Sequence, residues 1–175
     1  MAVSGRNYAG YVHRRVPPAA EEPLEAAEGR ILRFPRRQLF RKNSPRNDLG
    51  WEIYPDGLPQ VAAKLEKLLK RPIWVTENGT CDNQDAFRAR YIYEHLHAML
   101  RSGLPFERYY HWCFCDNFEW LEGESPRFGL INVDYATQTR TIKRSGEFYA
   151  DMIRNDGVTD EAYNTYVRGE VYRVE

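Results

Sequence analysis

Several features that would define a class of protein are scarce in this chain. Its 175 residues include only three cysteines, and 25 basic residues balance 25 acidic ones. Because an odd count cannot pair completely, we expect reduced thiols and a cytoplasmic protein. A neutral chain lacks the positive excess that nucleic acid or an anionic membrane attracts, and we expect neither as a partner. No apolar stretch approaches the roughly 18 residues of a membrane span, and the first residues lack a signal-peptide core.

Apolar and aromatic residues are plentiful, at 42% and 14%, which is enough for one globular core. Strand-like and helix-like segments alternate, and this alternation predicts an α/β architecture with a parallel sheet. The first expected helix spans 59–70, with Val61, Leu65, Leu68 and Leu69 on one face, and a strand over 73–76 follows it. The second expected helix starts near Asn83 or Asp85, closes at Gly103 and has an apolar face of Phe87, Tyr91, Leu96 and Leu100. A strand over 109–114, a loop over 116–126 and a helix over 145–153 complete the prediction.

A single carboxylate, Glu77, follows the short apolar run of residues 73–75 and precedes an Asn-Gly turn. Side chains at the carboxyl end of a parallel strand project toward the active site of a barrel. Glu77 is therefore a candidate nucleophile, general base or metal ligand. The alternative is a glutamate that caps the turn, in which Gly79 would allow a positive φ.

A second block, residues 112–120, reads Trp-Cys-Phe-Cys-Asp-Asn-Phe-Glu-Trp. Indole faces pack against the C–H faces of a sugar ring, and carboxylates accept hydrogen bonds from its hydroxyl groups. Two indoles and a carboxylate within nine residues therefore indicate a sugar site. The alternative is that Trp112, Phe114, Phe118 and Trp120 fill a core.

Together the two blocks resemble the family 1 glycoside hydrolases, the β-glucosidase family of retaining enzymes on a (β/α)8 TIM barrel. Segments 51–58, 90–96 and 133–145 extend the resemblance over most of residues 47–153. A whole barrel needs at least about 200 residues, so we expect roughly the last three β/α units. The chain then divides into a sixth-strand region with an irregular, charged excursion (1–46), the C-terminal barrel units (47–155) and a C-terminal tail (156–175).

The resemblance implies a role for each site residue. Glu77 matches the nucleophile, which forms a covalent glycosyl-enzyme in a double displacement. Glu119 matches the acceptor for the C4 and C6 hydroxyls of a β-linked glucoside or related saccharide, and Trp120 matches the donor to the C3 hydroxyl. Trp112 matches the platform beneath the ring, and Phe128 is expected to wall the pocket. The mechanism of the family requires no cofactor and no metal.

Other polar residues in these segments are given structural roles. Asp116 and Asn117 are expected to hydrogen-bond backbone within the loop rather than to serve as acid/base groups. His95 and His97 stand two apart on a helix and therefore on different faces, which does not suit a shared metal. His111 is expected to be packed beside the site.

Departures from the family pattern limit what the chain is expected to do alone. The Asn-Glu-Pro motif that carries the family's acid/base glutamate does not occur, and Ala9 stands where a tyrosine normally touches the nucleophile, unless Tyr11 replaces it. Glu124 replaces an aromatic residue. We therefore expect a truncated or split retaining β-glycosidase, with a companion chain or self-association completing the barrel. The alternative is a noncatalytic carbohydrate-binding or relic form of the same fold.

Overall fold

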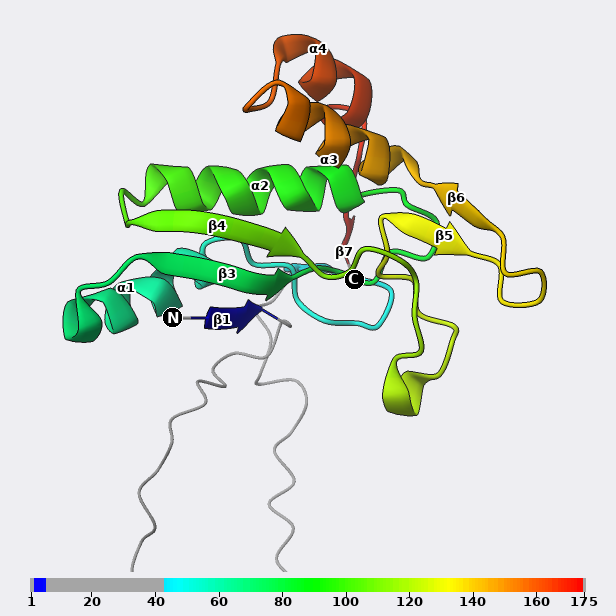
Figure 1. Ribbon diagram of the computed structural model, residues 1–175, viewed down its shortest axis with the longest axis horizontal. Helices are drawn as coiled ribbons and strands as arrows, with labels where there is room; N and C mark the ends of the chain where they lie inside the picture. The colour runs from blue at the N-terminus through cyan, green and yellow to red at the C-terminus, as the bar shows by residue number, and fades with distance from the viewer. Residues whose placement is uncertain (1, 6–42, 175) are drawn as a thin grey trace, which may run out of the picture.

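A parallel three-stranded sheet organises the protein. The computed structural model describes residues 2–5 and 43–174 (Figure 1). The strands follow the order β1 (Ala2–Gly5), β3 (Ile73–Asn78) and β4 (Phe106–His111), and both neighbouring pairs are parallel. Helix α1 (Gly57–Leu69) precedes β3, and α2 (Arg88–Arg101) connects β3 to β4. This alternation confirms the predicted α/β architecture.

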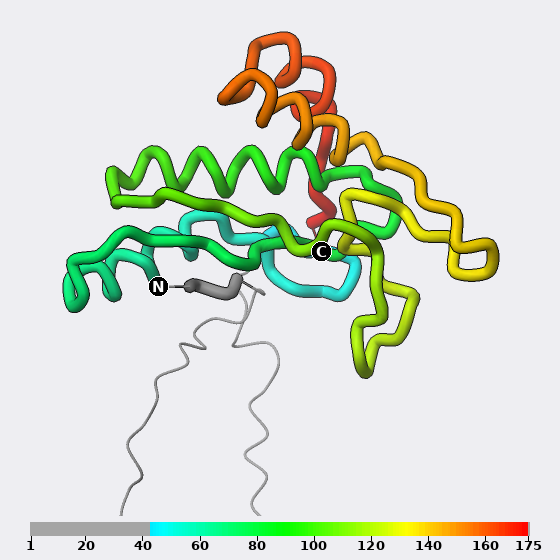
Figure 2. Tube along the Cα trace, viewed as in Figure 1, coloured from blue at the N-terminus to red at the C-terminus, as the bar shows by residue number. Residues whose placement is uncertain are grey.

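Shorter elements complete the described part of the chain (Figures 1 and 2). A loop with one turn of 3-10 helix leaves β4 and leads into an antiparallel hairpin, and two helical segments follow the last long helix. The last strand returns to pair with a short strand ahead of α1. These elements are β2 (Pro45–Arg46), η2 (Trp120–Glu122), β5 (Ile131–Val133), β6 (Arg140–Ile142), α3 (Arg144–Arg154), α4 (Asp160–Ala162), η3 (Tyr163–Val167) and β7 (Arg173–Val174).

Strands β3 and β4 both differ from their predicted bounds. Strand β3 begins at Ile73 as predicted and continues through Glu77 to Asn78. Strand β4 begins at Phe106, three residues before the predicted start, and ends at His111 rather than Phe114. Residues 112–114 therefore lie beyond the strand, and the peptide bond between Trp112 and Cys113 is cis.

Helix α2 begins differently from the prediction. Neither Asn83 nor Asp85 caps it; the carboxylate of Asp82 accepts hydrogen bonds from the backbone N–H groups of Ala86 (3.0 Å) and Phe87 (2.8 Å), just ahead of the first turn. At the other end the prediction is confirmed, since Gly103 adopts a φ of +65° after the last turn, a conformation that suits glycine.

Three leucines that were assigned to apolar helix faces are exposed. Leu68 and Leu69 lie in the last turn of α1, and Leu100 lies near the end of α2. Leu58 and Ala62 provide the buried face of α1 instead. The helix was therefore predicted correctly for α1, but its buried face was not: Val61 and Leu65 are only partly buried.

The largest core cluster lies between α2, α3 and the C-terminal segment. It contains no residue of the sheet, and Tyr109 of β4 packs against it. Residues 156–174, predicted only as a tail, contribute Ala162 and Val167 to this core. The buried members are Ile53, Phe87, Ala89, Tyr91, Ile92, Leu130, Phe148, Ala162 and Val167.

The sheet is covered on one side by helices, which leaves aromatic side chains exposed. In Figure 1, α2 lies next to β4, and α3 lies farther from the sheet on the same side. Trp74 and Tyr110 are 42% and 50% exposed, although Ile73 and Val75, on either side of Trp74, are buried. A parallel sheet normally has both faces covered. Within residues 2–5 and 43–174, no helix has the length and apolar character needed to cross a membrane.

Candidate active site

Glu77 and Trp112 are brought together by the carboxyl ends of two paired strands. Glu77 lies at the end of β3, opposite Ser4 of β1 in the strand register. Asn78 lies opposite His111, and its carbonyl oxygen accepts a hydrogen bond of 2.9 Å from the backbone N–H of Trp112. The predicted nucleophile and the predicted sugar platform therefore follow neighbouring strands at the same edge of the sheet, as in a barrel active site.

The side chain of Asn78 fixes this strand end from the core side. Its Nδ2 donates to the Tyr91 hydroxyl of α2 (3.1 Å), and its Oδ1 accepts from the Tyr109 hydroxyl of β4 (3.0 Å). Sequence reasoning treated Asn78 as a turn residue and missed this role. Tyr91 on the buried face of α2 was the available signal, because a buried phenol needs a polar partner.

The residue after Asn78 is a glycine for a reason other than the predicted one. Gly79 does not adopt a positive φ. A Cβ atom at this position would instead overlap the backbone carbonyl oxygen of Trp112. Gly79 therefore allows the two chain segments that carry Glu77 and Trp112 to approach each other closely.

The loop after β4 brings two of the predicted sugar contacts together. The indole Nε1 of Trp112 donates to Oε1 of Glu119 at 3.1 Å. Glu119 is only 8% exposed, whereas the adjacent Trp120 is 73% exposed. A buried carboxylate held by one indole beside a second, open indole forms a corner that suits a hydroxylated ring.

Backbone hydrogen bonds shape the tip of this loop. The N–H of Glu119 donates to the carbonyl of Gly123 (2.8 Å), and the N–H of Gly123 donates to the carbonyl of Trp120 (3.2 Å). Trp120 itself has a φ of +54°, which is unusual for a bulky residue. The tight turn thus leaves the indole of Trp120 exposed, and the loop that carries it projects from the body of the protein (yellow-green in Figure 1).

Phe128 lies behind the site. It is 3% exposed and forms a buried cluster with Cys81 and Cys113, against which Trp112 and Trp51 pack. The ring centroids of Phe128 and Trp51 are 5.8 Å apart. In this structure Phe128 supports the layer that carries Trp112, and its role as a pocket wall stays a prediction.

Asp116 is buried at the neck of the loop, as its predicted backbone role requires. Its Oδ1 accepts from the N–H of Gly129 and from Nζ of Lys143, both at 2.8 Å. Its Oδ2 lies 3.4 Å from both Nη1 of Arg127 and the N–H of Val133. The two cationic partners were not foreseen, because they follow Asp116 by 11 and 27 residues.

Burial keeps two of the helix and strand histidines, His95 and His111, in the neutral form. Burial lowers the pKa of His111 to about 3, and the nearby cations Arg88 and Lys143 act in the same direction. Burial also lowers the pKa of His95 to about 4, although the hydrogen bond to the Tyr91 carbonyl opposes the shift. His97 is exposed, so the two helix histidines do face apart. Among the described residues, no group of three His, Cys, Asp or Glu side chains could hold a metal ion.

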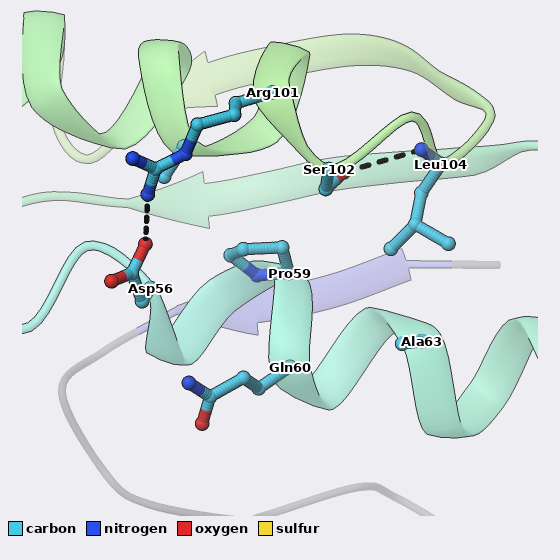
Figure 3. A pocket seen from close by; sticks show the side chains of 8 residues that line it. Asp56, Pro59, Gln60, Ala63, Arg101, Ser102 and Leu104 are labelled. Atoms are coloured by element: carbon cyan, nitrogen blue, oxygen red, sulfur yellow. Dashed lines mark hydrogen bonds and ion pairs between the residues drawn. The ribbon is translucent and has the colours of Figure 1, made fainter.

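The hollows of the described surface lie away from this corner. One of about 300 Å³ lies between the start of α1 and the end of α2, where Asp56 pairs with Arg101 at 2.7 Å (Figure 3). Another of about 300 Å³ lies near Asn47 and Arg173. Neither includes a predicted site residue.

Comparison with known proteins identifies the family of the chain. The family model described as glycosyl hydrolase family 1 matches residues 7–158. A β-galactosidase of Sulfolobus acidocaldarius is 36% identical over 154 residues, which are 86% of this chain and 31% of that protein. β-Glucosidase A of Thermotoga maritima is 34% identical over 155 residues, or 78% of this chain and 35% of its own length.

Solved structures give the same answer for the fold. The β-glycosidase of Pyrococcus horikoshii superposes with a TM-score of 0.68 at 34% identity, covering 73% of this chain and 31% of that one. A family 1 β-glucosidase of Thermotoga maritima in complex with isofagomine lactam superposes with a TM-score of 0.63 at 32% identity, covering 69% and 30%. The chain spans about a third of the length of these relatives, as the predicted partial TIM barrel requires. By sequence and by fold, the chain belongs to glycosyl hydrolase family 1.

Proposed function

We propose that this chain supplies the nucleophile and sugar-binding half of a retaining β-glycosidase active site. The observation that carries the proposal is the position of Glu77. It ends the middle strand of the sheet, beside the strand end from which Trp112 reaches Glu119. Carboxylates at the carboxyl ends of parallel barrel strands point into the catalytic pocket.

In the proposed reaction, the Glu77 carboxylate attacks the anomeric carbon of a β-glycoside as the glycosidic C–O bond breaks. A general acid protonates the departing oxygen, and water then displaces Glu77 from the glycosyl-enzyme. Glu119 accepts hydrogen bonds from the sugar hydroxyls, while Trp112 and Trp120 form its apolar contacts. The relatives are named as β-glucosidases and β-galactosidases, so a glucoside or galactoside is the proposed substrate class.

The general acid is proposed to come from outside these residues, since the chain has no Asn-Glu-Pro motif. A companion polypeptide, or failing that self-association, would cover the exposed side of Trp74 and Tyr110 and complete the barrel. The three free cysteines favour a reducing, cytoplasmic setting for this assembly.

The test is reconstitution. The chain is mixed with a polypeptide that carries the first five β/α units of a family 1 enzyme, and hydrolysis of an aryl β-glucoside is followed. We expect activity that Glu77→Gln abolishes and that Glu122→Gln, an exposed glutamate of the site loop, leaves intact. A folded mixture that stays inactive would contradict the split enzyme.

A noncatalytic sugar-binding role is the second candidate, and the exposed indole of Trp120 beside Glu119 favours it. This role predicts saturable binding of glucose or cellobiose by the chain alone. Binding would be unaffected by Glu77→Ala and lost in Trp120→Ala, with calorimetry as the measurement.

A further inference from the structure

We propose that Asp116 is a positioning residue, which sets the geometry of the sugar-binding corner through the neck of the loop that carries it. The inference rests on the proposed sugar-binding function. It concerns a buried carboxylate that lies outside the corner itself and belongs to neither the nucleophile nor the sugar contacts.

The loop of residues 117–128 leaves the protein and returns to it through a narrow neck. Backbone hydrogen bonds join the two sides: Cys113 N–H to the Phe128 carbonyl (3.2 Å), Ile131 N–H to the Phe114 carbonyl (2.9 Å) and Asp116 N–H to the Ile131 carbonyl (2.9 Å). Asp116 stands at the last of these, where the outgoing chain enters the loop.

The carboxylate of Asp116 ties the outgoing side to the returning side. Its side chain has no exposed surface, and Oδ1 accepts the N–H of Gly129 at 2.8 Å. Gly129 admits no side chain, because a Cβ there would overlap the backbone N of Asp116. The carboxylate thus holds the two sides of the neck together where Gly129 and Asp116 are in close contact.

Two cationic side chains contact this carboxylate. Lys143, 9% exposed at its side chain, donates from Nζ at 2.8 Å, and Arg127 lies 3.4 Å away. Arg127 also donates to the Val133 carbonyl at 2.9 Å. Replacing this carboxylate by a neutral side chain is costly, because the buried ammonium group of Lys143 would lose its charged partner.

The consequence for the corner follows from the chain path. Trp112 lies just before the neck, whereas Glu119 lies three residues into the loop, and their 3.1 Å hydrogen bond spans the neck. Rotation of the loop about its neck would move Glu119 relative to Trp112. Asp116 therefore fixes their relative position without contacting the sugar.

The test compares Asp116→Asn with Asp134→Asn, a matched change at an exposed carboxylate that accepts the N–H of Ala136 in the neighbouring turn. The first readout needs no sugar: the indole N–H resonance of Trp112, assigned with Trp112→Phe. We expect Asp116→Asn to move this resonance toward the position of a solvent-bonded indole. Asp134→Asn should leave it unchanged, with far-UV circular dichroism confirming the fold of both variants.

The second readout is the Kd for isofagomine lactam, measured by calorimetry. We expect Asp116→Asn to weaken binding about tenfold, the effect of losing one well-aligned charged hydrogen bond. If Asp116→Asn does not fold, Lys143→Gln takes its place, with the same direction and a smaller effect.

The outcomes separate the two proposals. A wild-type chain that does not bind isofagomine lactam, even with the completing barrel half present, contradicts the sugar-binding function, while the indole resonance still tests the role of Asp116. A folded Asp116→Asn or Lys143→Gln variant with the wild-type Trp112 resonance overturns the positioning role. An unchanged Kd in such a variant, where the wild type binds, overturns it as well.

Discussion

At the scale of single residues, Gly79 determines how closely the chain segments that carry Glu77 and Trp112 approach. Its missing side chain makes room for the carbonyl of Trp112. Gly79→Ala forces the backbone apart, and we expect a loss of about 1–3 kcal/mol in the free energy of unfolding, typical of overpacking. Urea unfolding measures this loss. Gly169→Ala is the control, because no atom lies within 4 Å of the added Cβ; equal effects of the two changes would contradict the close approach.

The cysteines provide a second prediction at this scale. Burial raises the pKa of the Cys81 thiol to about 11 and that of Cys113 to about 12. At pH 8 both are almost entirely protonated, and the thiol form is unreactive. We expect iodoacetamide to label only the partly exposed Cys115 in the native protein, and all three cysteines in urea. Intact mass reports the count, and rapid native labelling of Cys81 or Cys113 would refute the burial argument.

Individual residues also show what the sequence could and could not predict. Glu77, Trp112, Glu119 and Trp120 were predicted as site residues because each belongs to a short local motif, and the structure brings Trp112 against Glu119. The reason for Gly79 was missed because it depends on the backbone of Trp112, which is distant from Gly79 in the sequence. Local patterns predict turns, whereas a close approach of distant segments depends on tertiary structure.

At the scale of elements, α2 joins the sheet to the C-terminal segment through buried polar groups. His95 stacks on Tyr91 with ring centroids 3.8 Å apart, and its Nδ1 lies 2.7 Å from the Tyr91 carbonyl. Burial holds the pKa of His95 at about 4, below the usual 6.5. The unfolded chain therefore takes up a proton below pH 6.5 that the folded chain takes up only near pH 4.

This difference makes α2 a source of acid sensitivity. Stability from the lowered pKa of His95 is present above pH 6.5 and declines as pH falls to 4, by about 3 kcal/mol. We expect His95→Leu to flatten the pH dependence of the urea midpoint over this range. His97→Leu, a change at an exposed site on the same helix, should not. Parallel curves for His95→Leu and the wild type would contradict the prediction.

Element boundaries were predicted less well than element types. The start of α2 was misassigned because Asn83, Asp85 and Asp82 are all plausible acceptors in sequence. Only the path of the chain directs the carboxylate of Asp82 to the N–H groups of Ala86 and Phe87. The exposure of Leu100 was likewise not predictable, since helical period identifies a face but not how far the neighbouring layer extends.

At the scale of the whole molecule, the described residues form three neighbouring strands of a barrel with helices on one side. The edge of the sheet that carries the proposed site is held by contacts among the described residues: the strand pairing, the Asn78 hydrogen bonds and the neck at Asp116. The opposite side exposes Trp74 and Tyr110. Contacts within the described residues therefore support the proposed site, whereas we expect the exposed face of the sheet to be covered by a partner surface.

The most direct test of the central claim is peptide mapping of the chain after incubation with a dinitrophenyl 2-deoxy-2-fluoro-β-glucoside. This leaving group departs without acid assistance, so a nucleophile can be trapped without the general acid. We predict one stoichiometric 2-fluoroglucosyl adduct, on Glu77, that is lost in Glu77→Gln and retained in Glu122→Gln. An adduct on another carboxylate, or none when the completing barrel half is also present, would contradict Glu77 as the nucleophile.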